Sequence, residues 1–208
     1  AWAGKRESER AELLRRWAAL IDRDTDALGA LLALENGKPY AEAKGEIGYA
    51  NQFNRWFAGE AERMNGEYIP SPSAQDRILA IKQPVGPVAA ITPWNFPAAM
   101  ITRKVAPAFA AGCTVVLKPA SATPFTALAL AALAEEAGIP AGVLSVVTGD
   151  NRVIGPVLTG SPLIRKLSFT GSTEVGRLLM ADCAPTLKRL SMELGGAAPL
   201  IVFDDADL

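Results

Sequence analysis

Four short blocks of the chain carry polar side chains where an apolar, strand-like run ends. They span residues 91–97, 118–121, 169–172 and 192–196. Because the carboxyl ends of parallel strands gather at one edge of an open α/β sheet, where such folds bind nucleotides, these side chains could converge on a single site. Their amide, ammonium, hydroxyl and carboxylate groups could bind a nucleotide, stabilise an oxyanion and move a proton.

Asn95 and Glu193 are the candidates for catalysis in these blocks. Asn95 directly follows an apolar run, so its neutral side-chain amide could donate to a developing oxyanion; an asparagine that only caps a turn is the alternative. Glu193 lies in an otherwise apolar stretch, residues 190–196. Partial burial there would make its carboxylate a usable general base, and the alternative is a glutamate that faces solvent at a sheet edge.

Lys118, Ser121 and Ser172 are the candidates for binding a nucleotide. The spacing of Lys118 and Ser121 could bring an ammonium and a hydroxyl to one ribose or phosphate, although a lysine at a strand end is often only solvated. Gly171 permits a turn that brings the backbone at Ser172, where a helix starts, close to a phosphate or nicotinamide. Ser172 could equally be a simple helix cap.

Arg103 and the two cysteines complete the set of candidates. Arg103 falls on the helix after Asn95, where its planar guanidinium would suit a substrate carboxylate; a surface arginine is the alternative. Cys113 and Cys183 are the only thiols, and the chain has no histidine. Cys113 lies in an apolar run without acidic neighbours, so we expect a buried, inert thiol. We expect no metal site and no disulfide framework.

The N-terminal third has the periodicity of helices. Residues 6–36 predict two amphipathic helices that break around residues 22–25 and stop at Gly37, and residues 40–64 predict a third helix. We assign the aromatic side chains of this third helix to the core; they are Tyr49, Phe53, Trp56 and Phe57. Residues 66–83 become extended and contain two prolines, which indicates a hairpin or projecting ribbon.

From residue 87 onward, short apolar strands alternate with helical segments, the pattern of a parallel sheet built from βαβ units. The predicted strands are 88–92, 114–118, 144–147, 166–169, 187–194 and 200–203. Ser121 is the predicted hydroxyl cap of a helix, and residues 204–207 predict the start of another. The fold class is therefore α/β, a Rossmann-like parallel sheet with flanking helices, preceded by an N-terminal helical region and a projecting β-ribbon.

The balance of charge and hydrophobicity sets limits on partners. The 208 residues include 21 basic and 22 acidic side chains, a formal net charge of −1, which offers no electrostatic footprint for nucleic acid or an anionic membrane. No apolar run approaches the roughly 20 residues of a membrane-spanning helix, and the charged N-terminus does not resemble a signal peptide. We expect a cytoplasmic protein with no nucleic-acid or membrane partner.

The four blocks read Ile-Thr-Pro-Trp-Asn-Phe-Pro, Lys-Pro-Ala-Ser, Phe-Thr-Gly-Ser and Met-Glu-Leu-Gly-Gly. With them the chain resembles the aldehyde dehydrogenase superfamily, in particular its succinate-semialdehyde dehydrogenase branch, over essentially its whole length. The resemblance implies N-terminal helices at 1–65 that pack on the cofactor domain. It also implies an oligomerisation ribbon at 66–85 and an NAD(P)-binding domain at 86–208, cut off before the catalytic domain.

The resemblance also implies roles for single residues. Asn95 would hold the oxyanion, Glu193 would activate the hydrolytic water, and Arg103 would bind the carboxylate of succinate semialdehyde. The family's nucleophilic cysteine lies downstream of Glu193, beyond Leu208, so this chain alone is expected to be inactive. The motifs imply ten cofactor-binding residues: Thr92, Trp94, Asn95, Lys118, Pro119, Ala120, Ser121, Gly171, Ser172 and Leu194.

The expected cofactor is NADP, with NAD as the alternative. Members of the family that prefer NAD commonly carry glutamate at the position of Ser121, where a carboxylate would repel a 2′-phosphate. Ser121 and Lys118 together therefore favour NADP, and the full-length protein is expected to be a homo-oligomer. Two alternatives stay open: a nucleotide-binding protein without catalysis, and a dehydrogenase for another aldehyde, such as glutarate semialdehyde.

Overall fold

A five-stranded parallel sheet forms the centre of the computed structural model, which describes residues 2–73 and 75–207. The strand order is β5-β4-β3-β6-β7, and every neighbouring pair is parallel. The strands are β3 (Val88–Ile91), β4 (Val115–Lys118), β5 (Leu144–Val146), β6 (Lys166–Gly171) and β7 (Arg189–Leu194). The predicted α/β class with a Rossmann-like sheet is confirmed.

The order of the strands reverses at β3. The chain runs outward from β3 to β4 and β5, then returns through α6 (Asn151–Gly160) to place β6 on the other side of β3. Ile91, at the end of β3, lies opposite Phe169 of β6 and Lys118 of β4. Ligands of open α/β sheets bind outside the carboxyl ends of the strands at such a reversal, so this edge is where a site is expected.

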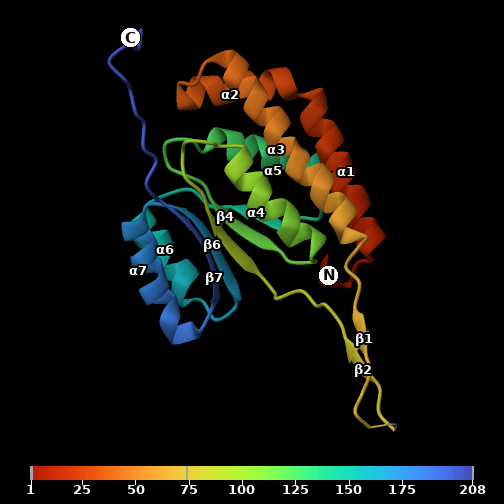
Figure 1. The fold of residues 1–208 in the computed structure, drawn as a ribbon. Helices are drawn as coiled ribbons and strands as arrows, with labels where there is room; N and C mark the ends of the chain where they lie inside the picture. Colours follow the sequence, from red (N-terminus) through yellow and green to blue (C-terminus); the bar gives the residue numbers. More distant parts are fainter. Residues whose placement is uncertain (1, 74, 208) are drawn as a thin grey trace.

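Helices cover both faces of the sheet (Figure 1). α4 and α5 pack on one face with α1, α2 and α3 behind them, and α6 and α7 cover the other face. The bounds are α1 (Glu7–Arg23), α2 (Thr25–Asn36), α3 (Tyr40–Ala61), α4 (Ala99–Ala110), α5 (Phe125–Glu136) and α7 (Thr173–Cys183), with 3-10 turns at Trp2–Gly4 and Ala184–Thr186. No helix within residues 2–73 and 75–207 has both the length and the apolar character needed to cross a membrane.

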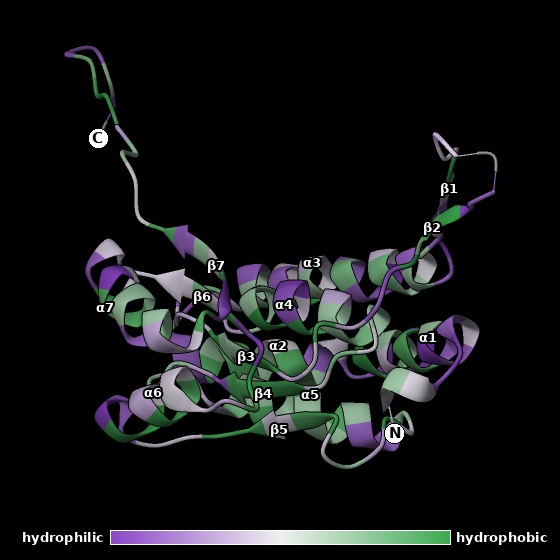
Figure 2. Cartoon of the chain, turned by 90° about the horizontal axis from the view of Figure 1, so that it is seen from below, coloured by the Kyte–Doolittle hydropathy of each residue, from purple (hydrophilic) through white to green (hydrophobic). Residues whose placement is uncertain are grey.

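Two hydrophobic cores follow from the alternation of side chains along the strands. Val88 and Ala90 belong to the larger core, shared with α1–α5, whereas Ala89 and Leu167 belong to a smaller core under α6 and α7. Figure 2 shows the hydrophobic residues concentrated in the central strands β3 and β4. Because the two faces meet different helices, the carboxyl edge can present separate sites on its two faces.

The helix boundaries of the N-terminal region agree with the prediction. α1 and α2 break at Asp24, and α2 ends before Gly37, whose φ of 81° is a left-handed conformation that glycine adopts without strain. The Gly37 N–H donates to the Ala33 carbonyl oxygen at 2.9 Å and closes the last turn of α2. Asn36, the last residue of α2, and Lys38, in the short connection to α3, contact the loop after β3.

The predicted ribbon is present within residues 66–83 and projects from the body of the protein (Figure 1). β1 (Glu67–Ile69) and β2 (Ile78–Ala80) pair antiparallel, with Tyr68 opposite Leu79. Tyr68 is 59% exposed and Leu79 is 69% exposed. The part of this ribbon in oligomer assembly stays a prediction.

Three expectations about the elements are wrong. Residues 200–203 form no strand: they are exposed and have no neighbouring strand among the residues described, and a strand needs a partner for its backbone hydrogen bonds. Residues 204–207 contain a turn instead of the start of a helix. The aromatic side chains of α3 are not all core, because Tyr49 is 42% exposed and Trp56 is 64% exposed.

Candidate active site

A cavity of about 470 Å³ lies at the carboxyl edge of the sheet, where the strand order reverses. The loops after β3, β4 and β6 border it together with α6 and α7. Seven of the ten predicted cofactor-binding residues line this cofactor-side cavity: Thr92, Trp94, Lys118, Ala120, Ser121, Gly171 and Ser172. The fold therefore brings three separate strand ends to one space.

Lys118 is the buried cation of this cavity, with only 5% of its surface exposed. Its Nζ donates to the Pro119 carbonyl oxygen at 2.9 Å and to the Ser121 Oγ at 3.4 Å. Burial lowers the pKa of Lys118, because desolvation disfavours the charged form. An ammonium held in this way beside a hydroxyl can bind a ribose hydroxyl or a phosphate oxygen.

Gly171 and Ser172 place the start of α7 against the same cavity. A Cβ atom at Gly171 would lie 2.5 Å from the Phe169 ring, so a side chain there would force the ring to move. Ser172 Oγ accepts a hydrogen bond from the Val175 N–H at 3.2 Å, so Ser172 is the cap of α7 as well as a wall of the cavity. The Thr170 hydroxyl is buried beside them with no hydrogen-bond partner in the described chain, and a bound ligand could supply one.

Pro119 and Leu194 are, with Asn95, the three predicted cofactor-binding residues that do not line this cavity. Pro119 is buried, and its carbonyl oxygen holds Lys118 Nζ. Leu194 ends β7 and packs on α7, where a Cβ atom at Gly176 would lie 2.5 Å from Leu194 Cδ2. Pro119 therefore supports Lys118 and Leu194 packs against α7, and neither residue forms the wall of the cavity.

The predicted cap of α5 by the Ser121 hydroxyl is wrong. α5 begins only at Phe125, and Ser121 lies in a turn before it. The Glu35 carboxylate of α2 accepts instead from the Phe125 and Thr126 N–H groups at 2.7 and 2.9 Å. The positive end of the helix dipole favours a carboxylate over a hydroxyl, and only the folded chain brings Glu35 there.

Asn95 lies beside the cofactor-side cavity and not in its wall. The residue is exposed, and its backbone carbonyl oxygen accepts from Lys38 Nζ at 3.0 Å. Across residues 2–73 and 75–207, the Asn95 side-chain amide has no hydrogen-bond partner. The side chain therefore does not cap its turn, and the amide is available as a donor.

A second cavity of about 440 Å³ lies on the opposite face of the sheet, between α4 and strands β6 and β7. Its charged lining consists of Arg103, Lys104, Lys166 and Glu193. Glu193 lies near the carboxyl end of β7, in register with Thr170. The expected partial burial of Glu193 is wrong for this chain: the residue is exposed, because β7 is the edge strand of the part of the sheet described.

Arg103 is held by two aromatic side chains of α3. Its Nη2 donates to the Tyr49 hydroxyl at 2.8 Å, and its guanidinium carbon lies 5.0 Å from the centre of the Phe53 ring, within the range of a cation–π contact. Arg103 Nε is buried and has no hydrogen-bond partner in the part of the chain described. An anionic group in the second cavity could accept a hydrogen bond from Arg103 Nε. The alternative, that Arg103 is an ordinary surface arginine, does not explain why this donor is buried.

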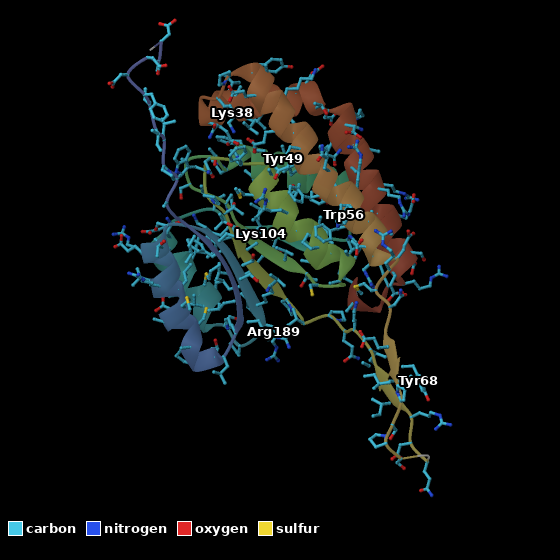
Figure 3. All side chains as sticks on the ribbon, in the orientation of Figure 1. Lys38, Tyr49, Trp56, Tyr68, Lys104 and Arg189 are labelled. Atoms are coloured by element: carbon cyan, nitrogen blue, oxygen red, sulfur yellow. The ribbon has the colours of Figure 1, made fainter. Side chains whose placement is uncertain are left out.

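Lys104 is a site residue that the sequence motifs did not indicate. It is only 9% exposed, and its Nζ donates to Ser168 Oγ at 3.2 Å. Figure 3 labels Lys104 between α4 and the sheet. Burial lowers the pKa of Lys104 to about 8; the Glu193 charge opposes this shift, and the charges of Arg103 and Lys166 add to it. In the sequence, the one feature that could have indicated Lys104 is its position on the apolar face of a predicted helix.

Both cysteines are buried, which was expected for Cys113. Cys113 borders the second cavity but precedes β4, at the amino end of the sheet, whereas Glu193 lies near the carboxyl end of β7. Burial raises the pKa of the Cys183 thiol, which disfavours the reactive thiolate. Neither thiol is placed to attack a group held between Asn95 and Glu193.

Comparisons with known proteins agree on one family. The profile described as "Aldehyde dehydrogenase family" matches residues 1–208. Over 207 residues the chain is 64% identical to 3-sulfolactaldehyde dehydrogenase of Pseudomonas putida. Over 208 residues it is 62% identical to the NADP(+) succinate-semialdehyde dehydrogenase GabD of Escherichia coli (strain K12) and 61% identical to glutarate-semialdehyde dehydrogenase of Pseudomonas aeruginosa. Each alignment covers 100% of this chain and 43% of the relative.

A solved structure agrees with the sequence comparisons. The crystal structure of aldehyde dehydrogenase from Brucella melitensis biovar abortus 2308 matches with a TM-score of 0.95 and 63% sequence identity. The match covers 99% of this chain and 43% of that chain. The chain thus spans less than half the length of the relatives that it matches.

Proposed function

The chain belongs to the aldehyde dehydrogenase family, and we propose that it forms the cofactor-binding part of an NAD(P)-dependent enzyme that oxidises an aldehyde to a carboxylic acid. The observation that carries this proposal is the cavity at the strand reversal, where Lys118, Ser121 and the start of α7 face one space. Because the chain covers 43% of its relatives, the activity is proposed for the complete polypeptide.

A nicotinamide dinucleotide suits the cofactor-side cavity, with NADP favoured over NAD. Lys118 and Ser121 offer an ammonium and a neutral hydroxyl, which can hold a 2′-phosphate, and the first amides of α7 offer donors to a pyrophosphate. The unpaired Thr170 hydroxyl and the volume of about 470 Å³ support the fit. The E. coli relative is named for NADP(+). When bound, the nicotinamide would accept the hydride of the aldehyde.

Asn95 and Glu193 would act on the two halves of the reaction. The unpaired Asn95 amide would donate to the oxyanion that forms when a thiolate attacks the aldehyde. Glu193 would then take a proton from the water that hydrolyses the resulting thioester. The thiolate would come from a cysteine outside these residues, because Cys113 lies at the amino end of the sheet and Cys183 is buried at the end of α7.

Arg103 favours an aldehyde that carries an anionic group at its far end. The second cavity holds the cations Arg103, Lys104 and Lys166 against one carboxylate, Glu193, and the buried Arg103 Nε has an unused donor. A terminal carboxylate would satisfy this guanidinium. Succinate semialdehyde is our first choice and glutarate semialdehyde the second; the names of the three relatives all denote aldehydes with an acidic group.

A panel of aldehydes tests this activity in the complete polypeptide. We expect NADP reduction with succinate semialdehyde and slower reduction with glutarate semialdehyde. An uncharged aldehyde of equal length should show a kcat/KM lower by about tenfold or more, because a hydrogen bond to a charged group contributes about 1.5–3 kcal/mol. The absorbance of the reduced cofactor measures the rates, and no reduction with any of these aldehydes would contradict the proposal.

The second candidate is a protein that binds the nucleotide without turning it over, which the burial of both cysteines favours for these 208 residues. Trp94 lines the cofactor-side cavity, so quenching of its fluorescence should report saturable NADP binding by this chain. Both candidates predict that binding. A complete polypeptide that binds NADP but reduces it with no aldehyde would decide for the second candidate.

We also infer that the ribbon joins subunits in a homo-oligomer. β1 and β2 form only a two-stranded sheet and expose Tyr68, Ile69, Ile78 and Leu79, and exposed strands of this kind pair readily with another chain. Replacing Leu79 by lysine in the complete polypeptide should lower the mass measured by sedimentation. An unchanged mass would contradict this assembly role.

A further inference from the structure

Four polar side chains near the junction of α2 and α3 reach the loops at the carboxyl edge of the sheet. They are Glu35, Asn36, Lys38 and Glu46, and we call them the clamp. None of the four lines either cavity. Their hydrogen bonds to the loops all go to backbone groups, so the clamp acts on the path of the chain and not on a ligand.

The first half of the Asn95 loop is held by its carbonyl groups. Asn36 Nδ2 donates to the Trp94 carbonyl oxygen at 2.8 Å, and Lys38 Nζ donates to the Asn95 carbonyl oxygen at 3.0 Å. Lys38 Nζ also lies 4.1 Å from the centre of the Phe96 ring, in a cation–π contact. Three consecutive residues, 94–96, are thus held from one side.

The second half of the loop is held by its amide groups. Glu46 Oε1 accepts from the Ala98 N–H at 2.9 Å and from the Ala99 N–H at 3.3 Å, where α4 starts. A carboxylate at this position also meets the positive end of the α4 dipole. Asn95 therefore lies between two anchored stretches of backbone.

Lys38 and Glu46 are joined to each other. Lys38 Nζ lies 2.6 Å from Glu46 Oε2, and the two side chains are only 14% and 1% exposed. Removing one partner of a buried ion pair leaves the other charge without compensation. Lys38 and Glu46 therefore depend on each other for their positions. Figure 3 shows Lys38 at the end of α2, close to the loops of the carboxyl edge.

We propose that the clamp positions Asn95 as the oxyanion donor, an inference that rests on the function proposed above. The clamp binds the backbone on both sides of Asn95 and leaves its side-chain amide unpaired, so the donor is aimed before the substrate arrives. Donors that are fixed in advance stabilise an oxyanion without reorganisation during the reaction. Lys38 and Glu46 are positioning residues, since they act through Asn95.

The same segment also anchors the cofactor loop. Glu35 accepts from the Phe125 and Thr126 N–H groups, at the helix start that follows the Lys118–Ser121 turn. Residues 35–38 therefore hold the loop after β3 and the loop after β4 together. The oxyanion donor and the nucleotide-binding lysine keep a constant relative position because one short segment binds both loops.

A kinetic cycle in the complete polypeptide tests the positioning role. Lys38→Met should lower kcat about tenfold, with the KM values for aldehyde and NADP within about twofold, because small displacements of a reacting group can reduce the rate up to about 100-fold. Lys38→Arg should restore most of kcat. In an Asn95→Ala background, Lys38→Met should lower kcat no further. An equal fall of kcat in both backgrounds, or a change in KM alone, would overturn the proposal.

Two further variants guard against a simple loss of folding. Asn36→Ala removes only the contact with the Trp94 carbonyl oxygen and should give a smaller fall of kcat, again abolished in the Asn95→Ala background. Arg15→Met breaks the exposed Arg15–Glu62 ion pair, whose atoms also lie 2.6 Å apart, and should leave kcat unchanged. A fall of kcat in Arg15→Met equal to that in Lys38→Met would overturn the proposal.

Hydrogen exchange separates this inference from the proposed activity. In the full chain without ligand, Glu46→Gln should accelerate exchange of the Ala98 and Ala99 amides several-fold, while amides of β4 and β6 exchange as before. Absent turnover in the unmodified enzyme would count against the proposed function alone. Unchanged exchange in Glu46→Gln would overturn the clamp whatever the activity of the enzyme.

Discussion

The two cavities lie on opposite faces of the sheet and differ in the elements that form their walls. The cofactor-side cavity lies between the loops after β3, β4 and β6 and the helices α6 and α7, so this chain builds its walls from several elements. The second cavity lies against α4, β6 and β7, and its carboxylate, Glu193, stands exposed on an edge strand. Binding of the cofactor can therefore be tested apart from the chemistry at Glu193.

The two cavities also differ in how they treat a buried lysine. Burial lowers the pKa of Lys118 and of Lys104 alike. Lys118 is held by a carbonyl oxygen and by the Ser121 hydroxyl, which are neutral partners. Lys104 instead faces the charges of Glu193, Arg103 and Lys166. The surroundings of Lys118 suit the binding of a neutral or anionic group. The protonation state of Lys104 depends on the charged side chains around it.

Glu193→Gln should separate the two cavities most clearly. Loss of a general base lowers rates by about 10²–10⁴-fold, so we expect kcat of the complete enzyme to fall by about 100-fold or more. The dissociation constant for NADP should stay within about twofold, because Glu193 does not line the cofactor-side cavity. Steady-state rates and fluorescence titration measure the two quantities, and a parallel loss of NADP binding would contradict the separation.

Arg103→Leu should change the choice of aldehyde. We expect kcat/KM for succinate semialdehyde to fall about 30-fold, and kcat/KM for an uncharged aldehyde of equal length to stay within about twofold, because only the carboxylate would use the guanidinium. Tyr49→Phe, which removes only the hydroxyl that Arg103 contacts, should show a smaller loss with the same selectivity. Equal losses for both aldehydes would show that Arg103 does not bind the carboxylate.

Lys118→Met should weaken the cofactor-side cavity alone. The dissociation constant for NADP should rise about tenfold, since a charged hydrogen bond is lost. Ser121→Glu should weaken NADP more than NAD, because a carboxylate repels the 2′-phosphate. Lys104→Met is the matched control, as it removes a buried lysine from the other face. Equal weakening of NADP binding in Lys104→Met would remove the distinction between the two lysines.

The pH dependence of stability should report the burial of Lys104. Lys104 has a pKa of about 8 in the folded chain, below the ordinary lysine value of 10.5. Between these values the unfolded chain binds more protons, so the contribution of Lys104 to the free energy of unfolding rises with pH, by about 3 kcal/mol in total at about 1.4 kcal/mol per pKa unit. Below about pH 8 both states are protonated and the destabilisation is complete. Urea unfolding at several pH values should show this rise in the parent chain and lack it in Lys104→Met.

Much of the fold could be predicted from the sequence because its signals are local. The apolar periodicity placed α1, α2 and the five strands of the sheet, and Gly37 marked the end of α2 through its left-handed backbone. The motif blocks placed seven cofactor-binding candidates in one cavity. The prediction failed where a segment depends on a distant partner: residues 200–203 have strand-like composition but no strand beside them in the described residues.

By itself, the sequence determined which residue types stand at the strand ends and that a parallel sheet would gather them. The tertiary structure alone decided that they divide between two faces, with Lys118 on one side and Arg103 and Glu193 on the other. It also decided that Glu35 caps α5 and that Lys38 and Glu46 hold the Asn95 loop. Backbone groups at helix and strand ends accept whichever polar side chain the packing brings, and no local pattern in the sequence specifies that choice.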